Sequence, residues 1–405
     1  MQMQLPDFRT VPKHILAALH WDDEYRTEEA MLVDAGFQLW QRGFRWLEEC
    51  EALPHGTKVV DIADNYRFVR LHFGRNWAWY VAWLRVMEGH DWRKEWKALR
   101  ATRNVHYREE LRKPLIPRPV RSRLPMNSKV AVIIATRNRP GYVLDVLFDL
   151  NRQTLPPMEV WVVDQSPEPL VVPDMEVPVQ VIHQPDQQGQ WAARNSALKL
   201  AKGQYLAFLD DDVRIDQHWL ANHLLIINHW QADVSTGVFV PEGKEMPSGM
   251  EFPKYASQWN ANNSLMRSSV VHQLGFFDTD YDGTRWGDHA YGCHAYKSGL
   301  VIVSNPLALA QDRSAPQGGL RDNKAGSYQG YRQLGTVLVE PVSGVARYFQ
   351  EFFDEQAYRR WVHSRVPWQG GRGLGLWWRL VTHWSRVLLR RPPGRKAWKA
   401  SKVHQ

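Results

Sequence analysis

The chain has 405 residues, enough for one large domain or two to three smaller ones. Its hydrophobic fraction of 44% and charged fraction of 23% are typical of a soluble globular protein. No run of about 18 apolar residues occurs, so no transmembrane helix is expected. The two cysteines, Cys50 and Cys293, lie far apart, which excludes a disulfide framework. With no signal-peptide pattern in the first residues, the sequence predicts a cytoplasmic protein.

The formal net charge is +8, and the tail of the chain is strongly basic. Most of the 20 tryptophans lie in the first hundred and last fifty residues. Basic charge with aromatic side chains suits nucleic acid, an anionic membrane surface or a polyanionic substrate, and charge alone does not choose among them. Because no zinc-finger, RNA-recognition or helix-turn-helix signature occurs, no nucleic-acid partner is expected.

Residues 1–112 form a tryptophan-rich region that we expect to be helical. Its apolar side chains recur at near-helical spacing, at Met31, Ala35, Leu39, Phe44 and Leu47, and residues 77–87 form another apolar run. Residues 113–127 follow as a linker, because four prolines and four basic residues between 113 and 125 exclude a regular helix or a central strand.

Residues 128–324 alternate between strand and helix patterns. Strands are expected at residues 130–135, 159–164, 177–183 and 204–209, and helices at residues 141–151 and 190–202. This order predicts the α/β class, with a mostly parallel sheet flanked by helices on both faces. In such sheets ligands bind beyond the carboxyl ends of the strands. Residues 325–405 form a basic C-terminal extension that we expect to be helical.

Polar side chains follow three of the expected strands. The most informative stretch is LAFLDDDVRID at residues 206–216, in which an apolar strand ends in Asp210, Asp211 and Asp212. Such a carboxylate cluster repels itself unless a cation is present, and Mg²⁺ or Mn²⁺ shared with a substrate phosphate is the usual solution. An acidic turn or a helix N-cap is the alternative. The other two strand ends carry TRNR at residues 136–139 and Asp164.

Five segments occur in the order and spacing of one known family. They are VAVIIATRNRP, VWVVDQS, QGQWAARNSALKLAKGQYLAFLDDD, NNSLMRSSVVHQLGFFD and WGDHAYGCHAYKSGL, spread over residues 128–322. Together they resemble the family 2 glycosyltransferases, which have the GT-A fold, a Rossmann-like sheet flanked by helices. The resemblance implies an inverting, metal-dependent enzyme of the hexosyltransferase type that uses a nucleotide-diphosphate sugar.

The resemblance assigns nucleotide-sugar contacts to nine residues: Thr136, Arg137, Asn138, Arg139, Asp164, Gly189, Arg194, Asp210 and Asp211. Arg139 would meet a phosphate, Asp164 the base, and Asp210 the ribose. A helix N-cap with solvated arginines is the alternative for residues 136–139, and a helix-face salt bridge is the alternative for Arg194. The family often has a second acidic residue after the aspartate of the second strand, where this chain has Gln165.

The resemblance also assigns the chemistry and the acceptor. Asp288 would be the catalytic base, although it can also be a helix N-cap. The family usually has Glu before this aspartate, where this chain has Gly287. The donor-sugar and acceptor region is assigned to Asn262, Asn263, Trp286 and Gly287, with simple turn chemistry as the alternative for the two asparagines.

The metal, Mn²⁺ or Mg²⁺, would be held by Asp212 and Asp312, and a plain loop aspartate is the alternative for Asp312. The expected donor is a UDP-sugar, and the expected acceptor is a carbohydrate or a lipid-linked sugar of bacterial-type cell-surface polysaccharide or glycolipid synthesis. A nucleotide-sugar-binding module without transferase activity is the alternative function. A nucleotidyltransferase ranks lower, because the loop TRNRPGY has only one glycine.

Residues 374–402 carry tryptophans and leucines at steps of three and four, next to clustered arginines and lysines. This pattern predicts an amphipathic helix. It would either lie on an anionic membrane surface, which makes the protein peripheral on the cytoplasmic face of the inner membrane, or pack on the catalytic domain.

Overall fold

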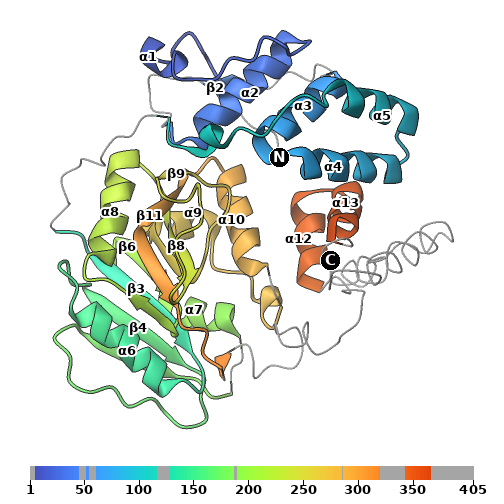
Figure 1. The fold of residues 1–405 in the computed structure, drawn as a ribbon. Helices are drawn as coiled ribbons and strands as arrows, with labels where there is room; N and C mark the ends of the chain where they lie inside the picture. Colours follow the sequence, from blue (N-terminus) through green and yellow to red (C-terminus); the bar gives the residue numbers. More distant parts are fainter. Residues whose placement is uncertain are drawn as a thin grey trace. The chain divides into compact units, whose positions relative to one another are not determined.

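The computed structural model describes residues 5–44, 52–53, 61–115, 127–186, 189–284, 286–316, 318–319 and 343–365 (Figure 1). The chain forms two compact units. The N-terminal unit consists of residues 1–119 and 247–255, and the sheet unit consists of residues 120–246 and 256–405. Each unit is described by itself.

The N-terminal unit is mainly helical, as expected. Its elements are β1 (Leu5–Pro6), α1 (Lys13–Leu16), α2 (Glu28–Gln41), β2 (Ala52–Leu53), α3 (Ile62–Phe73), α4 (Arg75–Met87), α5 (Trp92–Ala101), the 3₁₀ turn η1 (Glu109–Arg112) and β9 (Lys254–Tyr255). The side chains of Thr27, Asp61 and Asp91 accept backbone N–H groups at the starts of α2, α3 and α5. These caps satisfy donors that a helix leaves open in its first turn.

The sheet unit is built around a mixed sheet. Its strands are β3 (Val130–Thr136), β4 (Glu159–Asp164), β5 (Val179–His183), β6 (Tyr205–Leu209), β7 (Val213–Ile215), β8 (Val234–Pro241), β10 (Asn263–Arg267) and β11 (Ile302–Asp312). They lie in the order β5-β4-β3-β6-β10-β8-β11-β7. From β5 to β6 all neighbours are parallel, whereas β10 is antiparallel to both β6 and β8. The parallel half therefore brings the carboxyl ends of β3, β4 and β6 to one edge.

Helices cover both faces of this sheet, which confirms the expected α/β fold class. They are α6 (Pro140–Asn151), α7 (Gln190–Leu198), α8 (Trp219–Trp230), α9 (Ser268–Leu274), α10 (Gly287–Lys297), α12 (Ser343–Phe352) and α13 (Glu355–Arg365), with the 3₁₀ turn η2 (Thr279–Tyr281). Alternate residues of β3 belong to two cores. Val132 lies in the core that includes α6 and α8, and Ile133 lies in the core that includes α7, α9, α10, α12 and α13. A strand buried on both faces reads as a continuous apolar run, which is why its position could be predicted.

Helix α7 is shorter than expected, because it ends at Leu198 and not at Lys202. The chain then turns sharply into β6. At Gly203 a Cβ atom would lie under 3.0 Å from the backbone of Tyr205 and of Ala131. Glu159 accepts the backbone N–H of Lys202 at 2.6 Å, which fixes this turn beside the start of β4. The helical pattern in the sequence therefore runs past the point where packing on β3 stops the helix.

The described part of the C-terminal region packs on the sheet unit. Val345 and Ala346 of α12 belong to the core on the α10 side of the sheet. Arg347 bonds Asp278 at 2.7 Å and Asp280 at 2.6 Å, so α12 is also tied to the loop around η2. The tail predicted as an amphipathic helix, residues 374–402, lies outside the described residues. The proposed domain boundaries at 112, 127 and 324 stay predictions.

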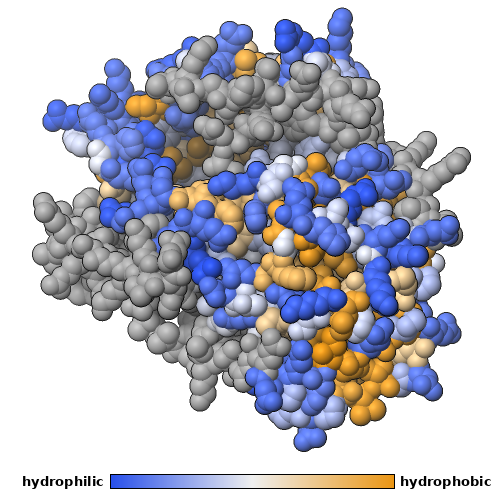
Figure 2. Space-filling model, turned by 180° about the vertical axis from the view of Figure 1, so that it is seen from behind, coloured by the Kyte–Doolittle hydropathy of each residue, from blue (hydrophilic) through white to orange (hydrophobic). Residues whose placement is uncertain are grey.

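The surface seen from behind mixes hydrophilic side chains with apolar areas (Figure 2). Large apolar side chains that are exposed in the sheet unit include Phe148, Val171 and Phe276. Among the described residues, the helices are too short or too polar to cross a membrane.

Candidate active site

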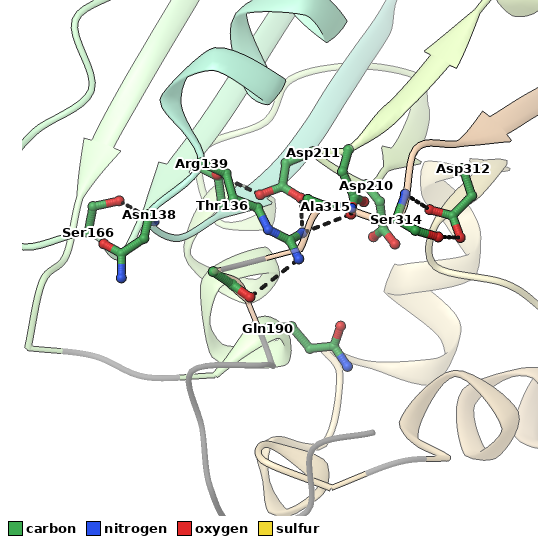
Figure 3. A network of polar contacts seen from close by, with 12 residues as sticks. Thr136, Asn138, Arg139, Ser166, Gln190, Asp210, Asp211, Asp312, Ser314 and Ala315 are labelled. Atoms are coloured by element: carbon green, nitrogen blue, oxygen red, sulfur yellow. Dashed lines mark hydrogen bonds and ion pairs between the residues drawn. The ribbon is translucent and has the colours of Figure 1, made fainter. Parts of the chain in front are cut away.

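The polar residues predicted at three strand ends meet at the carboxyl edge of the parallel half of the sheet (Figure 3). Thr136 closes β3 and is paired with Asp164, the last residue of β4. Asp210 follows β6, the other neighbour of β3, and its backbone N–H donates to the Asn262 carbonyl at 3.1 Å. Sheet order therefore brings together groups that lie up to 75 residues apart in sequence.

Asp211 is buried at the centre of this cluster. The Thr136 hydroxyl donates to its Oδ2 at 2.7 Å, and Arg139 Nη1 donates to its Oδ1 at 2.6 Å. The same Arg139 nitrogen lies 3.2 Å from Oδ2 of Asp212. Burial raises the pKa of Asp211, with Arg139 opposing this effect and Asp212 adding to it. Arg139 thus supplies one of the positive charges that a triple-aspartate cluster requires.

Asp210 pairs with a second arginine. Arg194 of α7 is almost fully buried, and its Nη2 contacts Asp210 Oδ1 at 3.0 Å and the Ala261 carbonyl at 3.2 Å. Burial raises the pKa of Asp210 to about 7, although Arg194 lowers it, and the neighbouring aspartates raise it further. Its side chain keeps 35% of its surface exposed, so a ligand has access to it.

Asp212 faces the loop that follows β11. Its Oδ2 accepts the backbone N–H of Ala315 at 3.0 Å, and its carbonyl accepts the N–H of Arg313 at 2.9 Å. Farther along this loop, Arg139 Nη2 donates to the Gly318 carbonyl at 3.3 Å, and Gly319 N–H donates to the Arg137 carbonyl at 3.0 Å. The loop after β11 is therefore attached to the same aspartates and arginine as the loop after β3.

The β4 end is held by hydrogen bonds within the loop that follows it. Asp164 is buried, and its two oxygens accept the N–H and hydroxyl of Ser166 and the N–H of Leu170. The Ser166 hydroxyl oxygen in turn accepts the N–H of Asn138, a residue with φ of 55°. Asp164 therefore shapes the loop beside the site, and base recognition through it stays a prediction.

Gly189 begins α7 with a φ of 137°, a conformation that favours glycine. The Gln165 amide bonds both its carbonyl and its N–H at 3.1 Å. Asp282 accepts the next N–H groups of the helix, from Trp191 at 2.7 Å and Ala192 at 3.0 Å. The helix start that we expected to face the nucleotide is thus capped by the protein itself. No local pattern predicts this cap, because Asp282 lies about 90 residues downstream.

Asp288 lies in the first turn of α10, with 30% of its side chain exposed. Its Oδ1 is 2.9 Å from the N–H and from Nδ1 of the next residue, His289. Trp286 has a φ of 83° and packs against Tyr348 and Trp361 of α12 and α13. Because the C-terminal helices support this turn, they help to hold Asp288 in place.

The absence of a glutamate at position 287 has a steric reason. A Cβ atom on Gly287 would lie under 3.0 Å from three atoms of the Trp191 indole. Trp191 is buried and is itself packed against Phe277 and Arg194. The indole thus fills the space beside the α10 start. No local sequence pattern indicates this contact, because the two residues lie far apart in the chain.

The two asparagines at the start of β10, Asn262 just before the strand and Asn263 within it, differ in position. Asn262 is partly exposed at the strand end, and its Oδ1 is buried without a partner among the described residues. Asn263 is fully buried, and its Nδ2 donates to the carbonyls of Val238 and Ala308 at 2.9 and 2.8 Å. Its Oδ1 accepts Trp219 Nε1 at 2.8 Å. Asn263 is therefore placed away from the donor-sugar region expected for it, because the pleat of β10 turns it into the core.

Asp312 uses both carboxylate oxygens in a local turn, with the N–H of Ser314 at 2.6 Å and its hydroxyl at 3.0 Å. Among the described residues, no three His, Cys, Asp or Glu side chains gather as a ready-made metal cage. A metal shared with a diphosphate needs only one or two carboxylates, and the oxygen-only donor set of Asp210 and Asp212 fits Mg²⁺ or Mn²⁺. The raised pKa values of Asp210 and Asp211 show that burial of their negative charge is incompletely offset by Arg139 and Arg194, and a bound cation would favour the ionised carboxylates.

Fold and site together define the class: an α/β protein whose ligand site lies beyond the carboxyl ends of parallel strands. Comparison with known proteins narrows this class. Residues 131–281 match the family model described as glycosyl transferase family 2. This match bears out the resemblance to the family 2 glycosyltransferases that the sequence gives for this part of the chain.

Two curated relatives are similar in sequence. The uncharacterized glycosyltransferase YwdF of Bacillus subtilis (strain 168) is 26% identical over 270 residues, which cover 60% of this chain and 96% of that protein. An uncharacterized glycosyltransferase of Haemophilus influenzae is 35% identical over 85 residues, which cover 20% of this chain and 29% of that protein.

Solved structures of glycosyltransferases are also similar. The mannosyltransferase PcManGT from Pyrobaculum calidifontis, in complex with GDP-Man and Mn²⁺, has a TM-score of 0.42 and 15% identity, with 85% of each chain covered. S. aureus TarS 1–349, in complex with UDP-GlcNAc, has a TM-score of 0.40 and 18% identity, with 68% of this chain and 92% of that chain covered.

Proposed function

We propose that this protein transfers a sugar from a nucleotide-diphosphate sugar, a UDP-sugar first of all, to an acceptor hydroxyl with inversion at the anomeric carbon. The observation that supports this proposal most strongly is the cluster of Asp210, Asp211 and Asp212 with Arg139 and Arg194 at the carboxyl edge of a family 2 domain. It combines oxygen ligands for a cation with two guanidinium groups for phosphate.

In the proposed donor site, Asp212 would hold a divalent metal, with Asp210 beside it and Asp312 as the further ligand predicted from the sequence. Mn²⁺ or Mg²⁺ held there would supply positive charge to offset that of the diphosphate. Arg139 and Arg194 place guanidinium groups within bonding distance of the aspartates, so they can exchange a carboxylate contact for a phosphate contact when the donor binds. Positioning and charge are the protein's main contributions.

Asp288 is proposed as the base. Its carboxylate is partly exposed at the start of α10, and the hydrogen bonds from His289 go to Oδ1. It would accept the proton of the acceptor hydroxyl while that oxygen attacks the anomeric carbon from the face opposite the diphosphate, and the bond from that carbon to the diphosphate breaks to release the nucleoside diphosphate. One displacement of this kind inverts the configuration.

The alternative function, a binding module without transferase activity, rested on Gly287 and Gln165. Both residues have a structural reason here: Gly287 makes room for Trp191, and Gln165 fixes Gly189. Their presence therefore does not favour loss of activity. We propose the acceptor to be a carbohydrate or a lipid-linked sugar in cell-surface polysaccharide or glycolipid synthesis, made on the cytoplasmic side of the membrane. These points rest on family analogy.

The test measures how fast the native protein and the Asp288→Asn variant transfer or hydrolyse each of a panel of nucleotide sugars in the presence of Mn²⁺. The substitution should lower transfer and donor hydrolysis by about 10²–10⁴ and leave donor affinity nearly unchanged, since it removes only the base. A native protein that binds a donor but neither hydrolyses nor transfers it supports the binding module. Loss of donor affinity in Asp288→Asn contradicts the role as base.

A further inference from the structure

Helices α4 and α5 of the N-terminal unit bury alanines and expose several tryptophans. Ala78 and Ala82 are 0% and 8% exposed, whereas Trp79, one residue from Ala78, is 43% exposed. The core between α3, α4 and α5 is formed mainly by alanines, with Tyr66 and Leu99. Because a buried indole stabilises a fold far more than a buried methyl group, folding does not explain this arrangement.

Helix α5 likewise buries an acidic side chain and exposes its basic ones. Its carboxylate, Glu95, is 2% exposed and bonds the Tyr66 hydroxyl at 2.6 Å and Arg85 Nε at 3.0 Å. Its cations are exposed, at Arg93, Lys94, Lys97 and Arg100. Glu95 is therefore used inside the unit, and within the helix itself, which Asp91 caps, the exposed charged side chains are all basic.

The exposed tryptophans lie beside these cations. Trp92 and Trp96 are four residues apart on α5 and are 60% and 49% exposed. Arg93, Lys97 and Arg100 follow at steps of four and three, which places them on the adjoining stripe of the helix. Trp79 of α4 meets Trp96 with ring centroids 5.4 Å apart, so indoles of the two helices adjoin. We call these six residues the α5 face.

We propose that the α5 face is a docking surface for an anionic lipid bilayer. Indole rings prefer the headgroup region of a bilayer, where an apolar ring and a polar N–H are both satisfied. Clustered arginines and lysines attract acidic lipids at the same depth. Exposed indoles flanked by exposed cations on a helix therefore match the composition of an interfacial helix. This surface is distinct from the acidic cluster and does not depend on the proposed reaction.

A bilayer fits these residues better than a nucleic-acid strand. Bases bind by stacking on open aromatic faces. Here Trp79 and Trp96 lie against each other, and the Arg93 guanidinium lies 5.5 Å from the centroid of Trp92. The ring faces are thus partly covered, while a large part of each indole surface stays exposed for insertion among lipids.

The test is co-sedimentation of the full chain with vesicles of phosphatidylcholine alone or with a quarter of phosphatidylglycerol, at low salt. The variant Arg93→Gln, Lys97→Gln, Arg100→Gln removes three exposed charges. It should lower partitioning onto the acidic vesicles about a hundredfold, since each cation near such a surface contributes roughly a factor of five. The variant Trp92→Ala, Trp96→Ala should lower partitioning about tenfold or more at unchanged charge.

A matched control removes three exposed lysines of the sheet unit, in Lys199→Gln, Lys202→Gln, Lys244→Gln. It should partition within about twofold of the native chain if the α5 face is the docking surface, because charges away from the contact are screened. Far-UV circular dichroism checks that every variant is folded. Three results overturn the proposal: no partitioning of the native chain, equal losses in the α5-face and control variants, or a nucleic-acid affinity that the α5-face variant loses while its vesicle binding is unchanged.

Discussion

Trp219 in the sheet unit is 0% exposed, whereas Trp92 in the N-terminal unit is 60% exposed. The first begins α8, packs between helix and sheet, and donates its indole N–H to Asn263. The second begins α5 and lies beside exposed cations. The exposure of each tryptophan depends on the core beside it. Large side chains form the core around Trp219, whereas alanines fill the space between α4 and α5. Tryptophan content alone therefore does not distinguish a core from a contact surface.

The largest effect expected from this comparison is on Trp219. Trp219→Ala should lower the free energy of unfolding by about 3–5 kcal/mol, because it opens a large cavity and removes the indole donor to Asn263. Urea denaturation of the purified variant measures it. A loss below about 1 kcal/mol would mean that the core around α8 collapses to fill the space.

A buried histidine of the same core should make stability depend on pH. His223 lies between Ser235 and Asn263, and burial lowers its pKa to about 4. The native state keeps it neutral, whereas the unfolded chain takes up a proton near pH 6.5, so stability is lost as pH falls from about 6.5 to 4. The contribution is about 3 kcal/mol. In His223→Gln the free energy of unfolding should fall less over this range, and an unchanged slope would contradict the assignment.

The smallest effect on stability is expected for the exposed tryptophan, Trp92. Trp92→Ala should change the free energy of unfolding by less than about 0.5 kcal/mol, because the side chain is mostly in solvent. The same denaturation assay applies, with Trp219→Ala as the reference. A loss of more than about 2 kcal/mol would show that Trp92 supports the fold, and the comparison between the two units would fail.

The strand ends could be predicted because they depend on local pattern. Thr136, Asp164 and Asp210 each follow an apolar run, and parallel strands must align such ends. The inward position of Asn263 could not be predicted, because it depends on the register of the antiparallel strand β10 against β6. The contact between Trp191 and Gly287 is equally hidden, since it joins two helices far apart in sequence.

The hydrogen bonds of Asp282 and Gln165 at the start of α7 also could not be predicted, because they join residues far apart in sequence. Asp282 sits in a turn after η2, where an aspartate needs no further explanation. Its partners, the first N–H groups of α7, become apparent only when the helix is placed on the sheet. Gln165 departs from the family motif, yet its side-chain amide bonds both the carbonyl and the N–H of Gly189.

The central claim is that the acidic edge of the sheet binds a nucleotide-diphosphate sugar with a metal. Calorimetric titration of UDP-sugars with Mn²⁺ tests it most directly, in the native chain, in Asp212→Asn and in Asp216→Asn. The control Asp216 is an exposed aspartate four residues along, so both variants lose the same charge. The account predicts that Asp212→Asn weakens donor binding about tenfold or more, while Asp216→Asn binds as the native chain does. Equal affinity in all three proteins would contradict it.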